Sequence, residues 1–315
     1  MKKYFNLLIF VSFIFLFIYL WQIELIIPSF PHAVWLVPSM LLLFAGFYVS
    51  TFSWKVALQT HGVRISMRDA VVSHGQSVFA KYIPGKVWVI LGRAGYVSDG
   101  KKALKNNTWF SFKEQIIYTW VGFTISVIPT LVFYGIRWIT LILVILVILI
   151  TLFLFVPSIH RWFLYLVSRV IRREFDIPVI SLHRSLPMIG ATTLIWIAWT
   201  LAFYFFMRVF AGEVTVAMAF AFPLSVCFGL IAILLPGGLG LREGIIAGYL
   251  ALAGMDVEIA ATIAFLNRLA FIAGEAFIFL LALTVRVSST KAAGTKATGT
   301  IAGGPEVTDT KTVGR

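Results

Sequence analysis

The chain has 315 residues, of which 60% are hydrophobic and only 12% are charged, and its formal net charge is +13. Soluble domains carry charge on about a quarter of their residues, so this composition excludes a soluble globular protein. Apolar runs of about 20 residues recur along the sequence, which predicts an all-α polytopic membrane protein and excludes a β-barrel of short alternating strands.

Six apolar runs are expected to span the membrane completely. The first, Phe5 to Trp21, follows two lysines and lacks a small-residue cleavage site, so we interpret it as a retained span and not as a signal peptide. The other five runs are Ala33 to Ser53, Gln115 to Tyr134, Trp138 to Val156, Leu186 to Phe210 and Ile259 to Val285.

Two further apolar stretches are each interrupted by a Pro-Gly pair with an arginine after it. They are Gln76 to Gly95, with Pro84-Gly85 and Arg93, and Val216 to Leu252, with Pro236-Gly237 and Arg242. A helix is expected to break at such a pair, and in lipid the break is stable only where it is buried in protein or lines a wet cavity. We predict two re-entrant hairpins, with two short full crossings in the second stretch as an alternative.

The positive charges predict the orientation of the chain. If both hairpins return to their own side, one face of the membrane carries both termini and the loops 55–113 and 157–185. That face then holds 22 of the 26 lysines and arginines. Since cytoplasmic loops are rich in these residues, both termini are expected in the cytoplasm.

The order of the segments predicts an inverted repeat within a membrane domain of residues 1–286. Two spans, a hairpin and a third span occupy residues 5–134, and the same series occupies residues 138–285 from the opposite side. Transporters with this layout bind substrate near the midplane, where helices of the two halves are broken. Residues 287–315 are rich in Thr, Ala, Gly and Lys and are expected to form a disordered basic tail.

The segment Pro236 to Gly244 is rich in glycine but lacks the Gly-Lys-Ser/Thr ending of a Walker A loop. Gly237, Gly238 and Gly240 would expose backbone amides, and Arg242 would add a fixed charge with bidentate geometry for phosphate. The alternative is that the glycines permit close packing and Arg242 pairs with Glu243 or another acid. An arginine within the membrane costs about 2.5 to 3.5 kcal/mol, which favours a functional role.

The first hairpin and the span after it supply further candidates for substrate binding. Lys81 and Lys86 flank the first break, where snorkelling to the headgroups and a binding role are equally good interpretations. Arg93 is the stronger candidate, because it lies furthest past the break. Glu114 opens the next span, where the helix dipole alone would favour a carboxylate.

Arg268 and Glu275 lie inside the last span, seven residues apart and therefore on one helical face. They are expected to point into the same interior cavity at a separation too large for direct pairing. Either could neutralise a partner from a hairpin, for instance Glu275 with Arg242. A structural ion pair and a substrate or proton site are both open interpretations.

Signals for other chemistry are missing from the sequence. The five histidines are expected in loops or at interfaces without metal-ligand spacing, and the single Cys227 has no base near it in the sequence. We therefore expect no metal, no cofactor and no catalytic residue. The basic residues that alternate with aromatic ones follow the expected cytoplasmic loops, so membrane orientation explains them without nucleic acid.

Four segments together resemble the lysylphosphatidylglycerol synthase transmembrane-region family over about residues 1–286. They are Tyr82 to Gly85 with Gly92-Arg93, Glu114 at the start of the next span, Leu235 to Gly244, and Asn267-Arg268. The family includes the flippase domain of the multiple peptide resistance factor. The resemblance implies a flippase that moves an anionic, aminoacylated or polyprenyl-linked phospholipid between the leaflets of a prokaryotic plasma membrane.

The aminoacyl-transferase domain of that family is missing from this sequence, so the resemblance does not extend to synthase activity, and we expect a transporter and not an enzyme. Two alternatives remain. The protein could be a membrane-embedded transferase acting on a polyprenyl-linked sugar, with Glu114, Glu243 or Glu275 as the base. It could instead be a non-catalytic partner of a separate lipid-modifying enzyme. A homo-oligomer is compatible with each of these interpretations.

Overall fold

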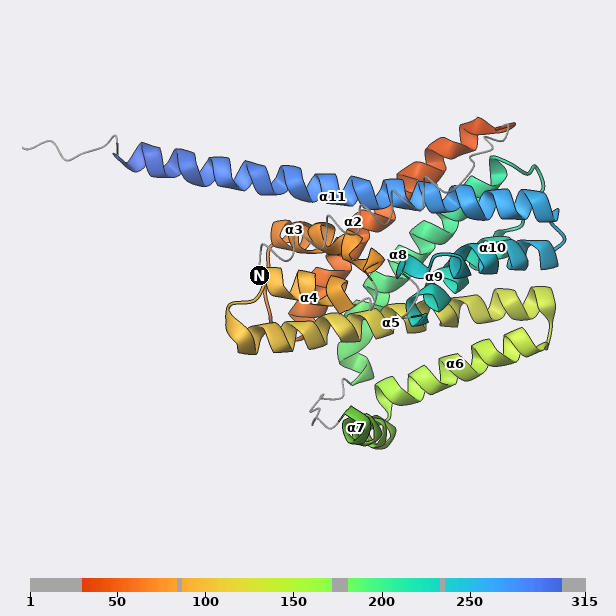
Figure 1. Cartoon of the computed structure of the whole chain (residues 1–315), viewed down its shortest axis with the longest axis horizontal. Coiled ribbons are helices and arrows are strands. Elements are labelled where there is room, and N and C mark those ends of the chain that lie inside the picture. Colours follow the sequence, from red (N-terminus) through yellow and green to blue (C-terminus); the bar gives the residue numbers. More distant parts are fainter. Residues whose placement is uncertain (1–29, 84–86, 172–180, 233–235, 302–315) are drawn as a thin grey trace, which may run out of the picture.

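The computed structural model describes residues 30–83, 87–171, 181–232 and 236–301, and every regular element in these ranges is a helix. Figure 1 shows long helices lying side by side, with shorter broken helices packed between them. The expected span Phe5 to Trp21 lies outside these ranges.

Within the described ranges, five helices are long and apolar enough to cross a membrane. Each coincides with one of the predicted spans to within two residues or extends beyond it, so these five predictions are confirmed at the level of helix length and composition. They are α2 (Leu36–Thr60, preceded by η1, Ala33–Trp35), α5 (Gly100–Tyr134), α6 (Trp138–Phe155), α8 (Leu182–Arg208) and α11 (Val257–Ile301).

The structure extends the regular elements beyond the apolar runs. Helix α5 begins at Gly100, well before the predicted span Gln115 to Tyr134. Its first turns are basic, and they are helical although they are not apolar. Helix α11 reaches Ile301 and thus crosses the expected boundary between the membrane domain and the tail. The segment after α6, expected as a loop, contains the amphipathic helix α7 (Pro157–Ile171). Hydropathy marks only continuous apolar runs, so a helix with one polar face escapes it.

Both Pro-Gly stretches form interrupted helices, as predicted. In the first, α3 (Met67–Ser77) leads into η2 (Val78–Tyr82) and, beyond residues 84–86, into α4 (Val87–Tyr96). The hydroxyl of Ser66 caps α3 by accepting a hydrogen bond from the Asp69 amide at 3.0 Å. In the second stretch, η3 (Val216–Phe220) and α9 (Ala221–Ile231) precede η4 (Pro236–Gly238) and α10 (Leu241–Leu252). Lys86 and Pro84-Gly85 lie outside the described residues.

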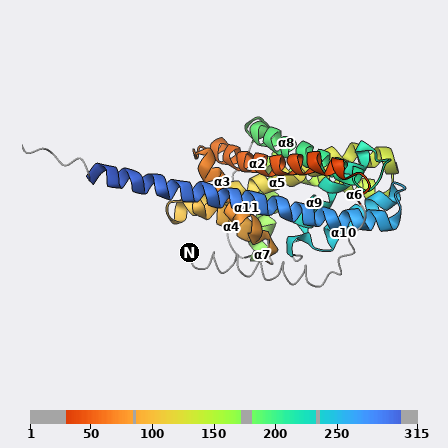
Figure 2. The same ribbon diagram turned by 90° about the horizontal axis from the view of Figure 1, so that it is seen from above.

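The two interrupted pairs approach the middle of the bundle from opposite ends. In Figures 1 and 2, α3 and α4 lie towards one end of the long helices, and α9 and α10 lie towards the other. The breaks meet, since η2 contacts η4. The region between the two halves is therefore where the backbone is least regular.

Helices from both halves of the chain form the support around these breaks. The indole of Trp199 in α8 donates to the Leu43 carbonyl of α2 at 3.1 Å, and the Ser39 hydroxyl donates to the Ala202 carbonyl at 2.8 Å. Helix α11 packs along α3 and α10, while α5 packs along α4 and α9. The halves thus interleave and do not form separate domains.

Candidate functional site

A cavity of about 140 Å³ lies where the two interrupted helix pairs meet. Its walls come from α2, α3, η2, α4, α5, α8, α9, η4, α10 and α11. Three cations and one carboxylate are among its lining residues, namely Lys81, Arg93, Arg242 and Glu114. The remaining lining is mostly aromatic and aliphatic, with the polar side chains of Ser50, His74, Gln115 and Tyr118.

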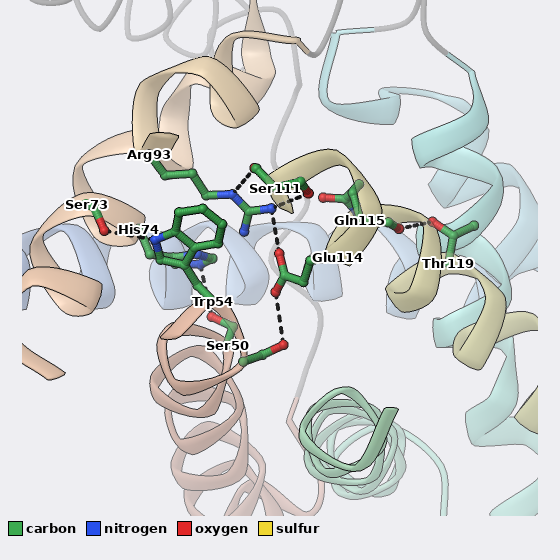
Figure 3. A network of polar contacts seen from close by, with 10 residues as sticks. Ser50, Trp54, Ser73, His74, Arg93, Ser111, Glu114, Gln115 and Thr119 are labelled. Carbon is green, nitrogen blue, oxygen red and sulfur yellow. Dashed lines mark hydrogen bonds and ion pairs between the residues drawn. The ribbon is translucent and has the colours of Figure 1, made fainter. Parts of the chain in front are cut away.

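The first half contributes a network of polar side chains that contact one another. We call it the Arg93 cluster, and it consists of Ser53, Arg93, Ser111 and Glu114. Arg93 Nη2 lies 2.5 Å from Glu114 Oε2, and the guanidinium also donates to the hydroxyl of Ser111 at 2.5 Å and to its carbonyl at 2.9 Å. Ser53 donates to the other carboxylate oxygen at 2.9 Å. Figure 3 shows Arg93 and Glu114 pointing towards each other.

Burial makes this pairing essential to the first half. The side chains of Arg93 and Glu114 are 3% and 7% exposed, and the guanidinium lies over the Trp54 ring at 4.5 Å from its centroid. The sequence offered only the helix dipole as a reason for a carboxylate at Glu114. The structure gives it a specific partner, and it leaves Arg93 with its charge already compensated.

His74 was expected in a loop or at an interface, and this prediction is wrong. It lies within α3, lines the cavity, and its Nε2 is 3.0 Å from the hydroxyl of Ser50. The polar groups Ser50 and Tyr118 were not recognised from the sequence. They occur within long apolar spans, where nothing local shows whether a polar residue faces a cavity or a neighbouring helix.

A second group, the Tyr82 cluster, joins the first break to the last helix through Lys81, Tyr82, Arg268 and Glu275. Lys81 forms an ion pair with the fully buried Glu275. The Tyr82 hydroxyl donates to Glu275 Oε2 at 2.9 Å and accepts from Arg268 Nη2 at 3.3 Å. The hairpin partner of Glu275 is therefore Lys81 and not Arg242. Lys81 points to a carboxylate inside the bundle, and this contact does not resemble snorkelling to headgroups.

Arg242 differs from the other buried cations in what surrounds it. It is 6% exposed, and its guanidinium lies 4.6 Å from the centroid of the Phe271 ring and 5.9 Å from that of Phe222. Within the described ranges it makes no hydrogen bond or ion pair, and its Nε is buried without a partner. Glu243 turns to Arg268 instead, with 3.7 Å between Oε1 and Nε. The expected alternative of an Arg242–Glu243 pair is not formed.

The glycines before α10 allow the backbone to approach these arginines. Gly237 and Gly238 have φ angles of +58° and +73°, which side chains other than glycine rarely adopt. A Cβ atom on Gly237 would lie 2.8 Å from Arg268 Nη2, and one on Gly238 would lie 3.1 Å from Arg242 Cδ. Gly240, with φ of +79°, is the N-cap residue directly before α10. The interpretation that these glycines permit close packing therefore agrees with the structure.

Comparison with known proteins agrees with this architecture. The family model described as lysylphosphatidylglycerol synthase TM region matches residues 4–282. The chain belongs to this family. The resemblance identified from the four sequence segments is thereby confirmed, and so is the assignment to a multi-pass membrane protein that associates with membrane lipids. No curated protein and no solved structure matches the chain.

In this member of the lysylphosphatidylglycerol synthase TM region family, the charges around the two breaks do not balance. Among the described residues of the two clusters and of α10 there are four cations and three carboxylates, which leaves one positive charge. They are Lys81, Arg93, Arg242 and Arg268, and Glu114, Glu243 and Glu275. Because each carboxylate lies nearest another cation, the excess charge resides at Arg242. An anion that enters the cavity meets this side chain.

Proposed function

We propose that the protein is a lipid transporter that moves a phospholipid between leaflets and binds its phosphate at Arg242. One observation supports this most strongly. Arg242 is a buried cation beside a cavity and has no anionic partner within the described residues. A charge in this position is costly in a membrane protein, and such residues usually mark the path of a substrate or ion. A phosphate would supply the missing negative charge.

The size of the cavity favours a headgroup and not a whole lipid. Its volume of about 140 Å³ is below the roughly 300 to 1,000 Å³ typical of pockets that enclose a drug-sized ligand. Only the polar end of a phospholipid would enter, and the acyl chains would remain in the surrounding bilayer. Lys81 and Arg93 line the same cavity, but each already has a carboxylate partner. They are secondary ligands in this proposal.

The arrangement of the helices also supports transport. Two interrupted pairs that approach from opposite ends fit two re-entrant hairpins of an inverted repeat, and in such transporters the site lies where the broken helices meet. Movement of one pair relative to the other would open the cavity to alternate sides. The excess of lysine and arginine in one set of loops supports cytoplasmic termini in a prokaryotic plasma membrane.

Leaflet exchange measured in proteoliposomes tests this function. Phospholipids with a fluorescent label are placed in both leaflets, and a membrane-impermeant reductant then reports how fast the inner pool becomes accessible. The wild-type protein is expected to accelerate exchange and Arg242→Ala to abolish the acceleration. Arg137→Ala, which changes an exposed arginine far along the chain from the site, is the matched control. Exchange at the rate of protein-free vesicles, or equal rates for wild type and Arg242→Ala, would refute the proposal.

The same assay distinguishes the three classes of lipid. Unlabelled anionic, aminoacylated and polyprenyl-linked lipids are added in turn, and the class that is transported slows exchange of the labelled lipid by competition. A zwitterionic phospholipid serves as the reference. Each class brings a phosphate group, so the other groups on the lipid decide which competes best.

A membrane-embedded transferase is the second candidate function. The surroundings of the Glu243 carboxylate favour it. Neither of its carboxylate oxygens has a hydrogen-bond partner in the described part of the chain, whereas Glu114 and Glu275 both accept hydrogen bonds. Glu243 would therefore be the acid available as a base. A single-turnover assay with a polyprenyl-linked sugar donor is expected to yield product that Glu243→Gln suppresses. Absence of product with the wild-type protein would exclude this candidate.

A further inference from the structure

Helix α7 lies outside the bundle that surrounds the cavity. It packs mainly against α6. Figure 1 shows it nearly end-on at the lower edge of the molecule, and Figure 2 shows it running across the direction of α5 and α6. His160 fixes its start, because His160 Nδ1 is 3.0 Å from the Phe153 carbonyl of α6 and the two rings stack at 4.8 Å. The crosswise direction of α7 is therefore set by a specific contact.

The outer side of α7 carries an apolar face and, directly beside it, a basic face, and the two meet where Arg169 lies two turns from Trp162. Trp162 and Leu166 are four residues apart, so they share one face, and they are 61% and 38% exposed. Arg161, Tyr165 and Arg169 also follow at intervals of four, and all three are exposed. Several large apolar side chains left uncovered together, here Trp162, Phe163 and Leu166, are unusual on a surface that meets only water.

The length of α6 indicates the depth of α7. Helix α6 has 18 residues, which corresponds to about 27 Å at 1.5 Å per residue, close to the roughly 30 Å of a bilayer hydrocarbon core. Its exposed side chains are apolar, among them Ile145 and Leu149. Only Val156 separates α6 from α7, so α7 begins where hydrocarbon gives way to headgroups.

We propose that α7 is an interfacial helix that lies in the headgroup layer and binds anionic phospholipid. Its apolar face continues the lipid-facing surface of α6, and its arginines carry the charge that complements an anionic leaflet. Helices that lie in the interface combine an apolar face with a basic one, and tryptophan and tyrosine favour this depth. The assignment does not depend on what the cavity transports.

Site-directed spin labelling tests the position of α7 in the full-length protein. Cys227 is fully buried, so a label attaches at cysteines introduced on the surface. Trp162→Cys and Leu166→Cys report the apolar face, Arg161→Cys reports the basic face, and Arg169→Cys reports the boundary between the two. Ile145→Cys on α6 is the hydrocarbon reference. In vesicles, collisions with oxygen are expected to dominate on the apolar face, and collisions with a water-soluble nickel complex on the basic face.

Two patterns would overturn this position. Low collision rates with both reagents at Trp162→Cys and Leu166→Cys would mean that protein covers the face, either a second copy or the segment Phe5 to Trp21. High nickel collision rates at every α7 position would mean that the helix lies in water. Neither pattern depends on whether lipid transport occurs.

Lipid preference is measured with a fluorophore on Trp162→Cys and with headgroup spin-labelled phosphatidylglycerol or phosphatidylcholine as quenchers. Phosphatidylglycerol is expected to quench more strongly. Replacing Arg161 and Arg169 by glutamine is expected to reduce this preference by about fivefold for each arginine, the contribution of one basic residue near an anionic surface. Arg137→Gln should leave it unchanged. Equal quenching by the two lipids before substitution would refute the anionic preference.

Discussion

Arg93 and Arg242 occupy comparable places in the two halves, each in the helix that follows a Pro-Gly break, yet their surroundings differ. Arg93 has an ion pair with Glu114 and two hydrogen bonds to Ser111. Arg242 lies beside two aromatic rings and, within the described residues, makes no hydrogen bond or ion pair. The comparison separates two uses of a buried cation. A compensated charge holds helices together, whereas an uncompensated charge is suited to a ligand.

Removal of the Glu114 carboxylate is expected to have the largest effect on stability. Glu114→Ala leaves Arg93 buried without a counter-charge, and loss of one partner of a buried ion pair costs about 3 to 5 kcal/mol. Thermal unfolding of the protein in nanodiscs measures the loss, with exposed Glu258→Ala as the control. The double variant Arg93→Met with Glu114→Met is expected to recover part of the loss. A single variant as stable as wild type would show that Arg93 does not need its pair.

Removal of the Tyr82 hydroxyl is expected to have the second largest effect on stability, because this group links Arg268 to Glu275. Tyr82→Phe keeps the ring and removes two contacts with charged groups, each of a kind that contributes about 1.5 to 3 kcal/mol. We expect a loss of unfolding free energy of about 3 kcal/mol, the lower end of the sum, because the contact with Arg268 is long at 3.3 Å. Tyr48→Phe, on the exposed side of α2, is the matched control. Equal stability of the two variants would mean that the bridge contributes nothing.

A methyl group at the second break tests the close approach of the two halves. Gly237→Ala combines a positive φ angle with a clash against Arg268 and Tyr82, and the conformational part alone costs about 1 to 2 kcal/mol. Gly190→Ala in α8 has open space and an ordinary helical backbone, so it is expected to stabilise the protein by about 0.5 to 1 kcal/mol. Denaturation midpoints that shift in the same direction for both would contradict this account.

Arg242→Met is expected to change stability least and transport most. The variant loses two cation–π contacts, worth about 0.5 to 2 kcal/mol each, but it also removes the cost of burying an unpaired charge. We expect a net change within about 1 kcal/mol of wild type, together with loss of leaflet exchange. A loss of stability as large as that of Glu114→Ala would place Arg242 with Arg93 among the structural cations.

The sequence predicted the features that depend on local chemistry. A Pro-Gly pair removes a backbone donor and loosens the backbone at the same point, so both breaks were expected at Pro84-Gly85 and Pro236-Gly237. A single proline is not sufficient, since α5 continues through Pro129 and α8 through Pro187. Five spans followed from the continuous apolar runs. The start of α5 and the existence of α7 were missed, because amphipathic or basic turns carry no hydropathy signal even where they are helical.

The partners of the buried charges could not be predicted in the same way. Glu275 and Lys81 form an ion pair although they are 194 residues apart in the sequence. The sequence was equally compatible with pairing of Arg242 to Glu243, pairing to Glu275, or no pairing. A one-residue rotation of about 100° on a helix decides whether a side chain faces a cavity or a neighbour.

The sequence by itself determined the membrane environment, the positions of the two breaks and the excess of positive over negative side chains. Only the tertiary structure decided which charge is left over, because Coulomb energy and hydrogen bonding depend on distances across the bundle and not on separation along the chain. The carboxylates of Glu114, Glu275 and Glu243 pair with Arg93, Lys81 and Arg268, respectively. Arg242 is then the side chain whose charge an anionic lipid could balance.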